Sequence, residues 1–277
     1  MSDCDTVGVV AALWRYPVKS LRGEQLTYAH LDGDGIQGDR EWAVESDANG
    51  RILSAKRYGS LLMAEAATGD DGKTLLTLPN GARFTAGTKA CDAALSEWLE
   101  QPVKLVRRES GRRAVFDGVD ISDSQPQAFE IETQPGLFMD TKSPLHILTS
   151  ASLASVASLI PGIDWSVDRF RPNILIETAA TPGYPEDAWI NRTIDIDGVG
   201  VWIRREATRC IVPTLAQPGL PKDRRILRAL IDKRANSLGV RAHPIGHGTI
   251  EIGARVALSE DLGPPPHLQH LERAPTH

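Results

Sequence analysis

The chain has 277 residues, a formal net charge of −5 and an apolar fraction of 41%, so it is long enough to bury a sizeable core. Its acidic balance disfavours nucleic-acid binding, and no run of 18 apolar residues exists that would span a membrane. The first residues lack the pattern of a signal peptide, and the three cysteines are far apart with no C-x-x-C pair. We therefore expect a cytoplasmic globular protein that binds neither nucleic acid nor membranes.

The first half of the chain has the pattern of short strands with one helix. Apolar character predicts a strand over 7–16, and alternation with period two predicts another over 25–31. Further short strands are predicted over 41–45, 75–78, 83–85 and 103–106. Thr88 is a suitable N-cap for a helix over 88–99. The polar, Gly- and Pro-containing stretch 109–143 is predicted to be a loop.

The second half alternates strands with two helices. A helix over 150–159, with Ser150 as its N-cap, follows a predicted strand at 145–149. An amphipathic helix is predicted over 222–234, directly after Pro221. Further strands are predicted over 173–177, 192–196 and 200–206, and a final strand pair over 249–252 and 255–258. Many short strands with few helices indicate an α+β, β-rich fold that contains a barrel. The predicted boundary divides the chain into residues 1–125 and 126–277.

A cysteine just beyond a strand end is the first candidate for chemistry. Cys210 follows Arg209 directly, and Arg205 is close in sequence. Cationic neighbours favour the thiolate, which is both a nucleophile and a soft metal ligand. On its own, however, an isolated cysteine is more often a structural residue than a functional one.

Two basic segments are further candidates. Arg169 and Arg171 flank a phenylalanine before Asn173, and in an extended segment their side chains would point to the same side, as a pair suited to phosphate or carboxylate. The alternative is a salt-bridged strand entrance. Lys19, Ser20 and Arg40 belong to predicted strand ends and turns, where ligand-binding groups concentrate, although each is unremarkable alone.

Taken in order, these segments resemble the MOSC-domain family with its N-terminal β-barrel extension, which includes the mitochondrial amidoxime-reducing components and their bacterial relatives. The resemblance runs from about residue 7 to about residue 258. It is carried by the ordered set of segments 16–20, 38–42, 147–153, 169–173, 186–189, 208–210 and 248–253. The family implies a MOSC β-barrel with peripheral helices, together with a smaller N-terminal barrel-like part whose first strands contribute to the site.

The resemblance also implies roles for residues. Cys210 would be the protein ligand of molybdenum in a molybdenum–molybdopterin cofactor, and the catalytic centre. The residues implied to contact the cofactor or line the metal site are Lys19, Ser20, Arg40, Arg169, Arg171, Asn173, Thr208 and Arg209. His146, in a strand near this site, is expected to be structural, with a proton relay as the alternative.

The implied function is a molybdenum-dependent oxidoreductase that reduces N-hydroxylated or related N–O compounds. No cysteine cluster of a fused ferredoxin is present, so electrons would come from a separate ferredoxin, flavoprotein or cytochrome. The loop 212–218 lacks the acidic residue that many relatives have after the cysteine, which leaves substrate preference open. Two alternatives remain: a carrier that transfers sulfur or the cofactor through Cys210, and a β-rich binding module in which Cys210 is merely structural.

Overall fold

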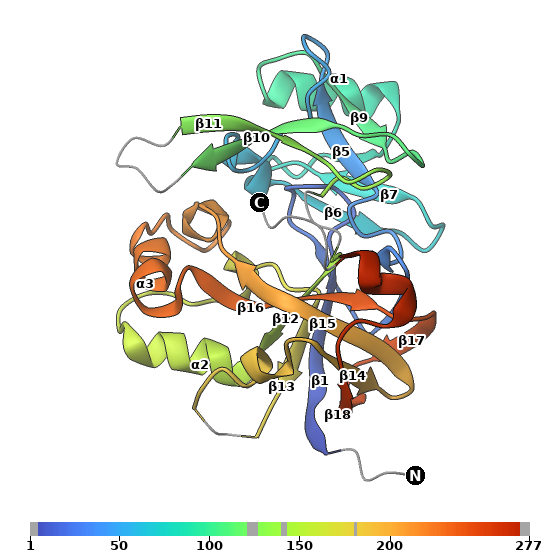
Figure 1. The fold of residues 1–277 in the computed structure, drawn as a ribbon. Coiled ribbons are helices and arrows are strands. Elements are labelled where there is room, and N and C mark those ends of the chain that lie inside the picture. The colour runs from blue at the N-terminus through green and yellow to red at the C-terminus, as the bar shows by residue number, and fades with distance from the viewer. Residues whose placement is uncertain (1–4, 121–126, 140–142, 180–181, 272–277) are drawn as a thin grey trace.

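Strands from both ends of the chain form one closed barrel in a computed structural model that describes residues 5–120, 127–139, 143–179 and 182–271 (Figure 1). Within these ranges the barrel has seven strands: β1 (Thr6–Arg15), β12 (Leu145–Thr149), β13 (Ile174–Glu177), β14 (Arg192–Ile196), β15 (Val199–Thr208), β16 (Ser237–Pro244) and β18 (Arg255–Leu262). Their order is β13-β12-β16-β15-β14-β18-β1, and β1 closes the barrel by pairing with β13. The predicted α+β, β-rich class with a MOSC-type barrel is confirmed.

Aliphatic side chains from every barrel strand fill its interior. Leu13 of β1, Ile147 of β12 and Val201 of β15 are fully buried in one cluster that runs through the barrel. Such residues fit strands because branched side chains pack well on a pleated surface. Among the seven barrel strands described here, β12 and β13 are the parallel pair, and helix α2 (Ser150–Leu159) connects them. A parallel pair requires such a crossover.

The smaller part of the molecule has its own core and lies above the barrel in Figure 1. It contains α1 (Lys89–Trp98) and the sheets β5–β9, β6–β7–β8 and β10–β11. Their bounds are β5 (Trp42–Ser46), β6 (Glu65–Thr68), β7 (Thr74–Thr77), β8 (Arg83–Thr85), β9 (Val103–Arg107), β10 (Val115–Asp120) and β11 (Gln127–Glu132). The boundary predicted at 125/126 falls outside the described residues and stays a prediction.

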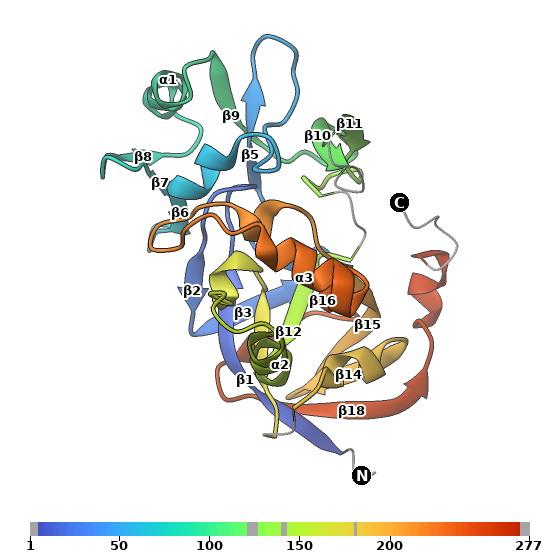
Figure 2. The ribbon, with the colours of Figure 1, turned by 90° about the vertical axis from the view of Figure 1, so that its left-hand side faces the viewer.

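Two helices cover one side of the barrel. Helices α2 and α3 (Arg225–Arg234) lie near each other on the side that faces the viewer in Figure 2. Val156 of α2 and Ile226 and Leu230 of α3 share an apolar cluster with Phe170, which anchors the segment before β13. Within the described ranges, no helix is long and apolar enough to cross a membrane.

Several predicted elements differ from the structure. The strand predicted over 25–31 is interrupted at Thr27, which gives β2 (Glu24–Leu26) and β3 (Tyr28–Asp32), and β4 (Gly35–Ile36) follows. The loop predicted over 109–143 contains the β10–β11 hairpin. Strands β6 and β16 were not predicted. The strand after β16, β17 (Gly248–Glu251), pairs with β3 and not with β18, so the predicted final strand pair is wrong.

Helix boundaries show smaller differences. Thr149 caps α2, because its side chain accepts a hydrogen bond from the Ser152 amide, so the predicted cap at Ser150 is one residue late. Helix α3 begins at Arg225, three residues after the predicted start. The predicted cap of α1 is confirmed, since Thr88 accepts a bond from the Cys91 amide.

Candidate functional site

Cys210 lies two residues beyond the end of β15, and the residue is partly exposed. One main-chain hydrogen bond and one side-chain hydrogen bond, both to Asn236, hold the backbone of the preceding residue, Arg209, in place. The Arg209 amide donates to the Asn236 carbonyl, and Asn236 Nδ2 donates to the Arg209 carbonyl, both at 2.8 Å. Thr208, the last residue of β15, is exposed. The cysteine is therefore presented at the end of the barrel by a turn with defined geometry.

The Arg209 side chain turns inward from this position. Its Nη2 donates to the Phe170 carbonyl at 2.8 Å, and its Nη1 donates to His146 Nε2 at 3.1 Å. A guanidinium has no acceptor, so Nε2 is the unprotonated ring nitrogen and Nδ1 carries the hydrogen. Burial and the charge of Arg209 hold the pKa of His146 well below its usual value. His146 is thus a neutral, buried partner of Arg209.

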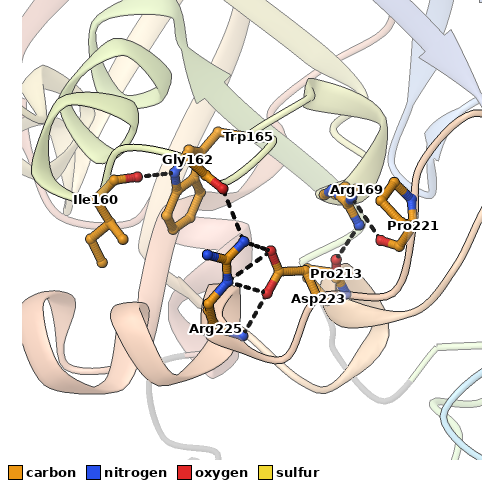
Figure 3. Close-up of polar contacts among 8 residues, drawn as sticks. All are labelled: Ile160, Gly162, Trp165, Arg169, Pro213, Pro221, Asp223 and Arg225. Carbon is orange, nitrogen blue, oxygen red and sulfur yellow. Dashed lines mark hydrogen bonds and ion pairs between the residues drawn. The ribbon is translucent and has the colours of Figure 1, made fainter.

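Arg169 is fully buried and holds the loop that follows Cys210 (Figure 3). Its Nη1 donates to the Pro213 carbonyl at 3.2 Å, and its Nη2 donates to the Pro221 carbonyl at 2.9 Å. The same loop leads into the Asp223–Arg225 ion pair, which joins the residues before α3 to the first residue of that helix. Arg169 thereby fixes both ends of the segment that borders the cysteine.

The arginine pair predicted in an extended segment is wrong in its geometry. Residues Val167–Arg169 form a 3-10 helix, and Arg171 has a left-handed backbone with φ of +54°. The two side chains consequently diverge: Arg169 points to the loop after Cys210, and Arg171 lies over the Tyr16 ring. The sequence pattern alone carried no sign of this change in backbone direction.

Asn173 links three segments beneath the site and is fully buried. Its Oδ1 accepts a bond from the His146 amide at 3.2 Å, and its Nδ2 donates to the Trp14 carbonyl at 3.3 Å. Both side-chain atoms of this predicted cofactor residue are thus used between strands β1 and β12.

Tyr16 connects two predicted arginines. The guanidinium carbon of Arg171 lies 4.2 Å from the centre of its ring, and that of Arg40 lies 5.2 Å away. Arg40 forms an ion pair with Asp39, which also accepts a bond from the Tyr16 amide. Burial lowers the pKa of Arg171 to about 10, and its interactions with Tyr16 and Asp39 oppose the shift. Tyr16 belongs to the segment 16–20 that carries the family resemblance, but the sequence did not predict it as a site residue.

Lys19 and Ser20 lie on the side toward the smaller part of the molecule. Lys19 Nζ donates to the Phe138 carbonyl at 2.9 Å and lies 3.9 Å from the centre of the Phe116 ring. Ser20 Oγ accepts a bond from the Ala55 amide at 3.0 Å. Both residues therefore connect the loop after β1 to the smaller part.

Unfavourable backbone conformations occur at three predicted site residues. Ser20, Arg40 and Arg171 have φ values of +71°, +49° and +54°. A non-glycine residue in this region costs about 1–3 kcal/mol and persists only where its surroundings enforce it, which is typical of ligand sites. The same backbone region is also occupied by Glu100, Asn191, Asp197, Ala235 and Asn236, so the conformation alone does not define a site.

Family models match most of the chain. A model described as "MOSC N-terminal beta barrel domain" matches residues 7–114, and one described as "MOSC domain" matches residues 131–257. The chain therefore belongs to the MOSC-domain family with an N-terminal MOSC barrel, as the sequence resemblance predicted.

Individual proteins are similar over much of this length. The human mitochondrial amidoxime-reducing component 1 is 29% identical over 76% of this chain and 66% of its own length. Molybdenum cofactor sulfurase from Drosophila grimshawi is 26% identical over 59% of this chain and 23% of its own. The YUAD protein structure from Bacillus subtilis has a TM-score of 0.46 and 13% identity, and the match covers 91% and 94% of the two chains. The chain spans just under two thirds of the human protein that it matches.

Proposed function

We propose that this chain binds a molybdenum–molybdopterin cofactor and that Cys210 is its protein ligand. The observation that carries the proposal is a partly exposed thiol at the barrel end, with the guanidinium groups of Arg209 and Arg171 close enough to interact with it electrostatically. Soft thiolates suit such a metal. Within the described ranges, no group of three or more His, Cys, Asp or Glu side chains is arranged to hold a metal ion. A single protein ligand, with further donors from a cofactor, agrees with that arrangement.

The charges near Cys210 fit an anionic group. No carboxylate among the described residues lies within ion-pair distance of Arg171, and burial of its guanidinium already lowers its pKa. An anion there would compensate a cation that the protein leaves without an ion pair. We assign Arg171, Arg40, Lys19 and Ser20 to the anionic end of the cofactor. Thr208 and Arg209 would line the metal site.

The remaining two predicted residues, Arg169 and Asn173, would affect the cofactor only by holding other parts of the site in place. Arg169 uses its two Nη atoms on the loop after Cys210, and Asn173 uses its amide between strands. We therefore assign both to positioning of the site, without contact to the cofactor. When bound, the cofactor would supply two-electron redox chemistry, and the protein would supply the ligand, the anion clamp and a shaped cavity.

The reaction that we propose is reduction of an N-hydroxylated or related N–O compound. Two electrons and two protons would convert N–OH into N–H and water. The electrons would come from a separate ferredoxin, flavoprotein or cytochrome. The similarity to a protein named as an amidoxime-reducing component supports this reaction class. The cytoplasmic location stays a prediction, because the same relative is named as mitochondrial.

A second candidate function is transfer of sulfur or of the cofactor through Cys210. The partial exposure of Cys210 favours it, since a persulfide carrier has to present its sulfur to a partner. The similarity to proteins named as molybdenum cofactor sulfurases points to the same chemistry. A cyanide-releasable sulfur on Cys210, without reduction of N–O compounds, would establish this alternative.

The first experiment compares molybdenum and pterin content in the wild type, Cys210→Ala and Cys91→Ala, all expressed in a cofactor-proficient host. Cys91 is the matched control because its thiol is buried in α1, and burial raises its pKa to about 11. We expect near-stoichiometric molybdenum in the wild type and Cys91→Ala, and its loss in Cys210→Ala. Equal molybdenum in all three proteins would exclude Cys210 as the ligand. Reductase turnover with a chemical electron donor then separates the two candidate functions.

A further inference from the structure

Helix α3 and the residues just before it concentrate positive charge on an acidic protein. The segment 222–235 contains six basic and two acidic side chains, a formal charge of +4, whereas the whole chain carries −5. The helix lies on the outside of the barrel (Figure 2), and its residues Ile226 and Leu230 are buried in an apolar cluster. Five of the six basic residues are exposed to solvent.

Three of the six cations are used within the fold or point elsewhere. Arg225 forms an ion pair with Asp223 at 2.7 Å (Figure 3). Arg234 forms one with Asp187, also at 2.7 Å, in the segment before β14. Lys233 lies on the side of the helix toward α2. These contacts hold α3 in place and leave three cations on its outer side.

These three cations form a patch together with one exposed isoleucine. Arg224, Arg228 and Ile231 have helical spacing and share one side of α3, and Lys222 directly precedes their N-terminal end. Lys222 and Arg224 have no ion pair among the described residues, and Arg228 has an exposed pair with Asp232 of the kind that contributes little. Ile231 is 42% exposed. We call Lys222, Arg224, Arg228 and Ile231 the docking patch.

Both ends of α3 are bonded to residues that flank Cys210. At its beginning, the Asp223 amide donates to the Thr214 carbonyl at 2.9 Å. At its end, Asn236 and Arg209 are joined by two bonds of 2.8 Å. A helix of ten residues is about 15 Å long, so α3 borders the whole short segment that carries the cysteine. A protein bound to α3 would therefore lie beside the proposed metal site.

The composition of the docking patch suits a transient protein partner of opposite charge. Electron-transfer encounters use small interfaces, below about 1,200 Å², and complementary charges raise their association rates. Reduction of N–OH to N–H and water takes two electrons, so a one-electron carrier has to dock and leave twice in each turnover. The patch has three cations, fewer than the roughly four to eight that are typical of sites for anionic lipids. A small acidic protein is thus the better match.

We propose that the docking patch on α3 binds a small acidic one-electron carrier protein, which delivers electrons to the site at Cys210. The inference rests on the proposed function and deepens it, because it names the charge of the electron donor and the surface that receives it. Since the cations are exposed, the complex weakens as salt screens them.

The test measures binding before any turnover. The probes are a plant-type [2Fe–2S] ferredoxin and a flavodoxin, both acidic, and cytochrome c is the basic comparison. Dissociation constants are measured on the full chain, with and without molybdenum. We expect both acidic carriers to bind more tightly than cytochrome c, and to lose about tenfold in affinity when the salt concentration rises from about 50 to about 500 mM.

Charge reversal locates the surface. Lys222→Glu/Arg224→Glu should weaken binding of the acidic carriers at least about tenfold, because two attractions become repulsions. Arg83→Glu/Lys89→Glu is the matched control, since it changes the net charge equally at two exposed positions of β8 and α1 that have no ion pair among the described residues. We expect the control to change binding by less than about twofold at moderate salt, where distant charges are screened.

A second variant and a second probe keep the test decisive. Ile231→Ala removes exposed apolar surface without a change in charge, so it should weaken binding severalfold and leave the salt dependence unchanged. Failure of both acidic carriers to bind, or equal losses in Lys222→Glu/Arg224→Glu and Arg83→Glu/Lys89→Glu, would overturn the proposal. So would tight binding of phosphatidylserine vesicles that Lys222→Glu/Arg224→Glu abolishes, because the patch would then be a lipid site.

Turnover distinguishes this inference from the proposed function. With a chemical electron donor, Lys222→Glu/Arg224→Glu should reduce benzamidoxime as fast as the wild type. With reduced ferredoxin as the donor, the same variant should have a KM for ferredoxin about tenfold higher. Binding of ferredoxin without turnover from either donor would contradict the reductase function alone. Turnover in which the KM for ferredoxin is the same in the wild type and the variant would contradict the docking patch alone.

Discussion

Two groups of predicted residues differ in how the protein uses them. The support residues, all buried and bonded inside the protein, are His146, Arg169, Asn173 and Arg209. The face residues, all partly exposed, are Ser20, Arg40, Arg171 and Cys210. Three of the four face residues have a left-handed backbone, and none of the support residues does. The support residues direct side-chain hydrogen bonds to other parts of the protein, although Nε of Arg169 and Nε of Arg209 have no partner among the described residues. Three of the face residues are instead held in backbone conformations that they would not adopt by themselves.

Arg169 and Arg171 show the difference most directly, because they are two positions apart in one motif. Arg169 donates to two carbonyls, and Arg171 stacks on an aromatic ring with no ion pair among the described residues. The residue type is the same, so the role follows from the backbone between them. A buried arginine is thus a poor indicator of ligand binding until its partners are known.

The largest effect should come from Arg169→Met. It leaves the carbonyls of Pro213 and Pro221 without their donor, and each unsatisfied group costs about 1–3 kcal/mol. We expect the free energy of unfolding to fall by about 2–4 kcal/mol, measured by urea denaturation. Hydrogen exchange should increase in residues 212–221. A stability within about 1 kcal/mol of the wild type would show that Arg169 does not support the loop.

Arg171→Met should have a small effect on stability and a larger effect on the molybdenum content. Removal of a partly buried cation without an ion pair changes stability little, by less than about 1 kcal/mol. Loss of an anion-binding group should instead lower molybdenum retention by about 10- to 100-fold, the range for residues around a metal site. Urea denaturation measures the effect on stability, and the molybdenum content after dialysis measures the effect on retention. A stable variant with full molybdenum would move Arg171 out of the proposed anion clamp.

Local sequence patterns, such as apolar periodicity and helix-capping residues, were sufficient to predict most strands and helices, including β1, β12 and α1. It was insufficient for β16, whose sequence contains a glycine and ends in proline. Gly239 has φ of +76°, and a Cβ there would lie 2.6 Å from the Ile147 carbonyl oxygen on the neighbouring strand. Strand β16 therefore depends on close pairing with β12, which is a tertiary property that single-sequence periodicity does not contain.

The sequence predicted the candidate site only in part, because it contains the residues but not their tertiary contacts. Cys210 and the basic segments were found because the family resemblance orders them along the chain. The division between support and face residues depends on hydrogen-bond partners and on φ at Arg171, which arise only when β13, the loop after Cys210 and β1 come together.

His146 offers a pH test of the support residues. Its pKa in the folded protein is depressed by burial and by Arg209, so the unfolded state binds more protons below about pH 6.5. The wild type should therefore lose up to about 1.4 kcal/mol of stability per pH unit as the pH falls below 6.5. His146→Gln should lose less over the same range, and His30→Gln, which alters an exposed ring, is the matched control. Parallel pH profiles for the wild type and His146→Gln would contradict a neutral, buried His146.

Ser20 gives the smallest effect and separates strain from contact. Ser20→Gly relieves a left-handed backbone worth about 1–2 kcal/mol and loses the bond from the Ala55 amide, worth about 1 kcal/mol, so its stability should stay near that of the wild type. Ser20→Ala loses the bond and keeps the strain, and should be about 1 kcal/mol less stable than Ser20→Gly in urea denaturation. Both variants lack the hydroxyl, so a direct contact between Ser20 and the cofactor would lower molybdenum retention equally in the two. If retention instead follows stability and is higher in Ser20→Gly, the backbone conformation of Ser20 matters to the site and its hydroxyl does not.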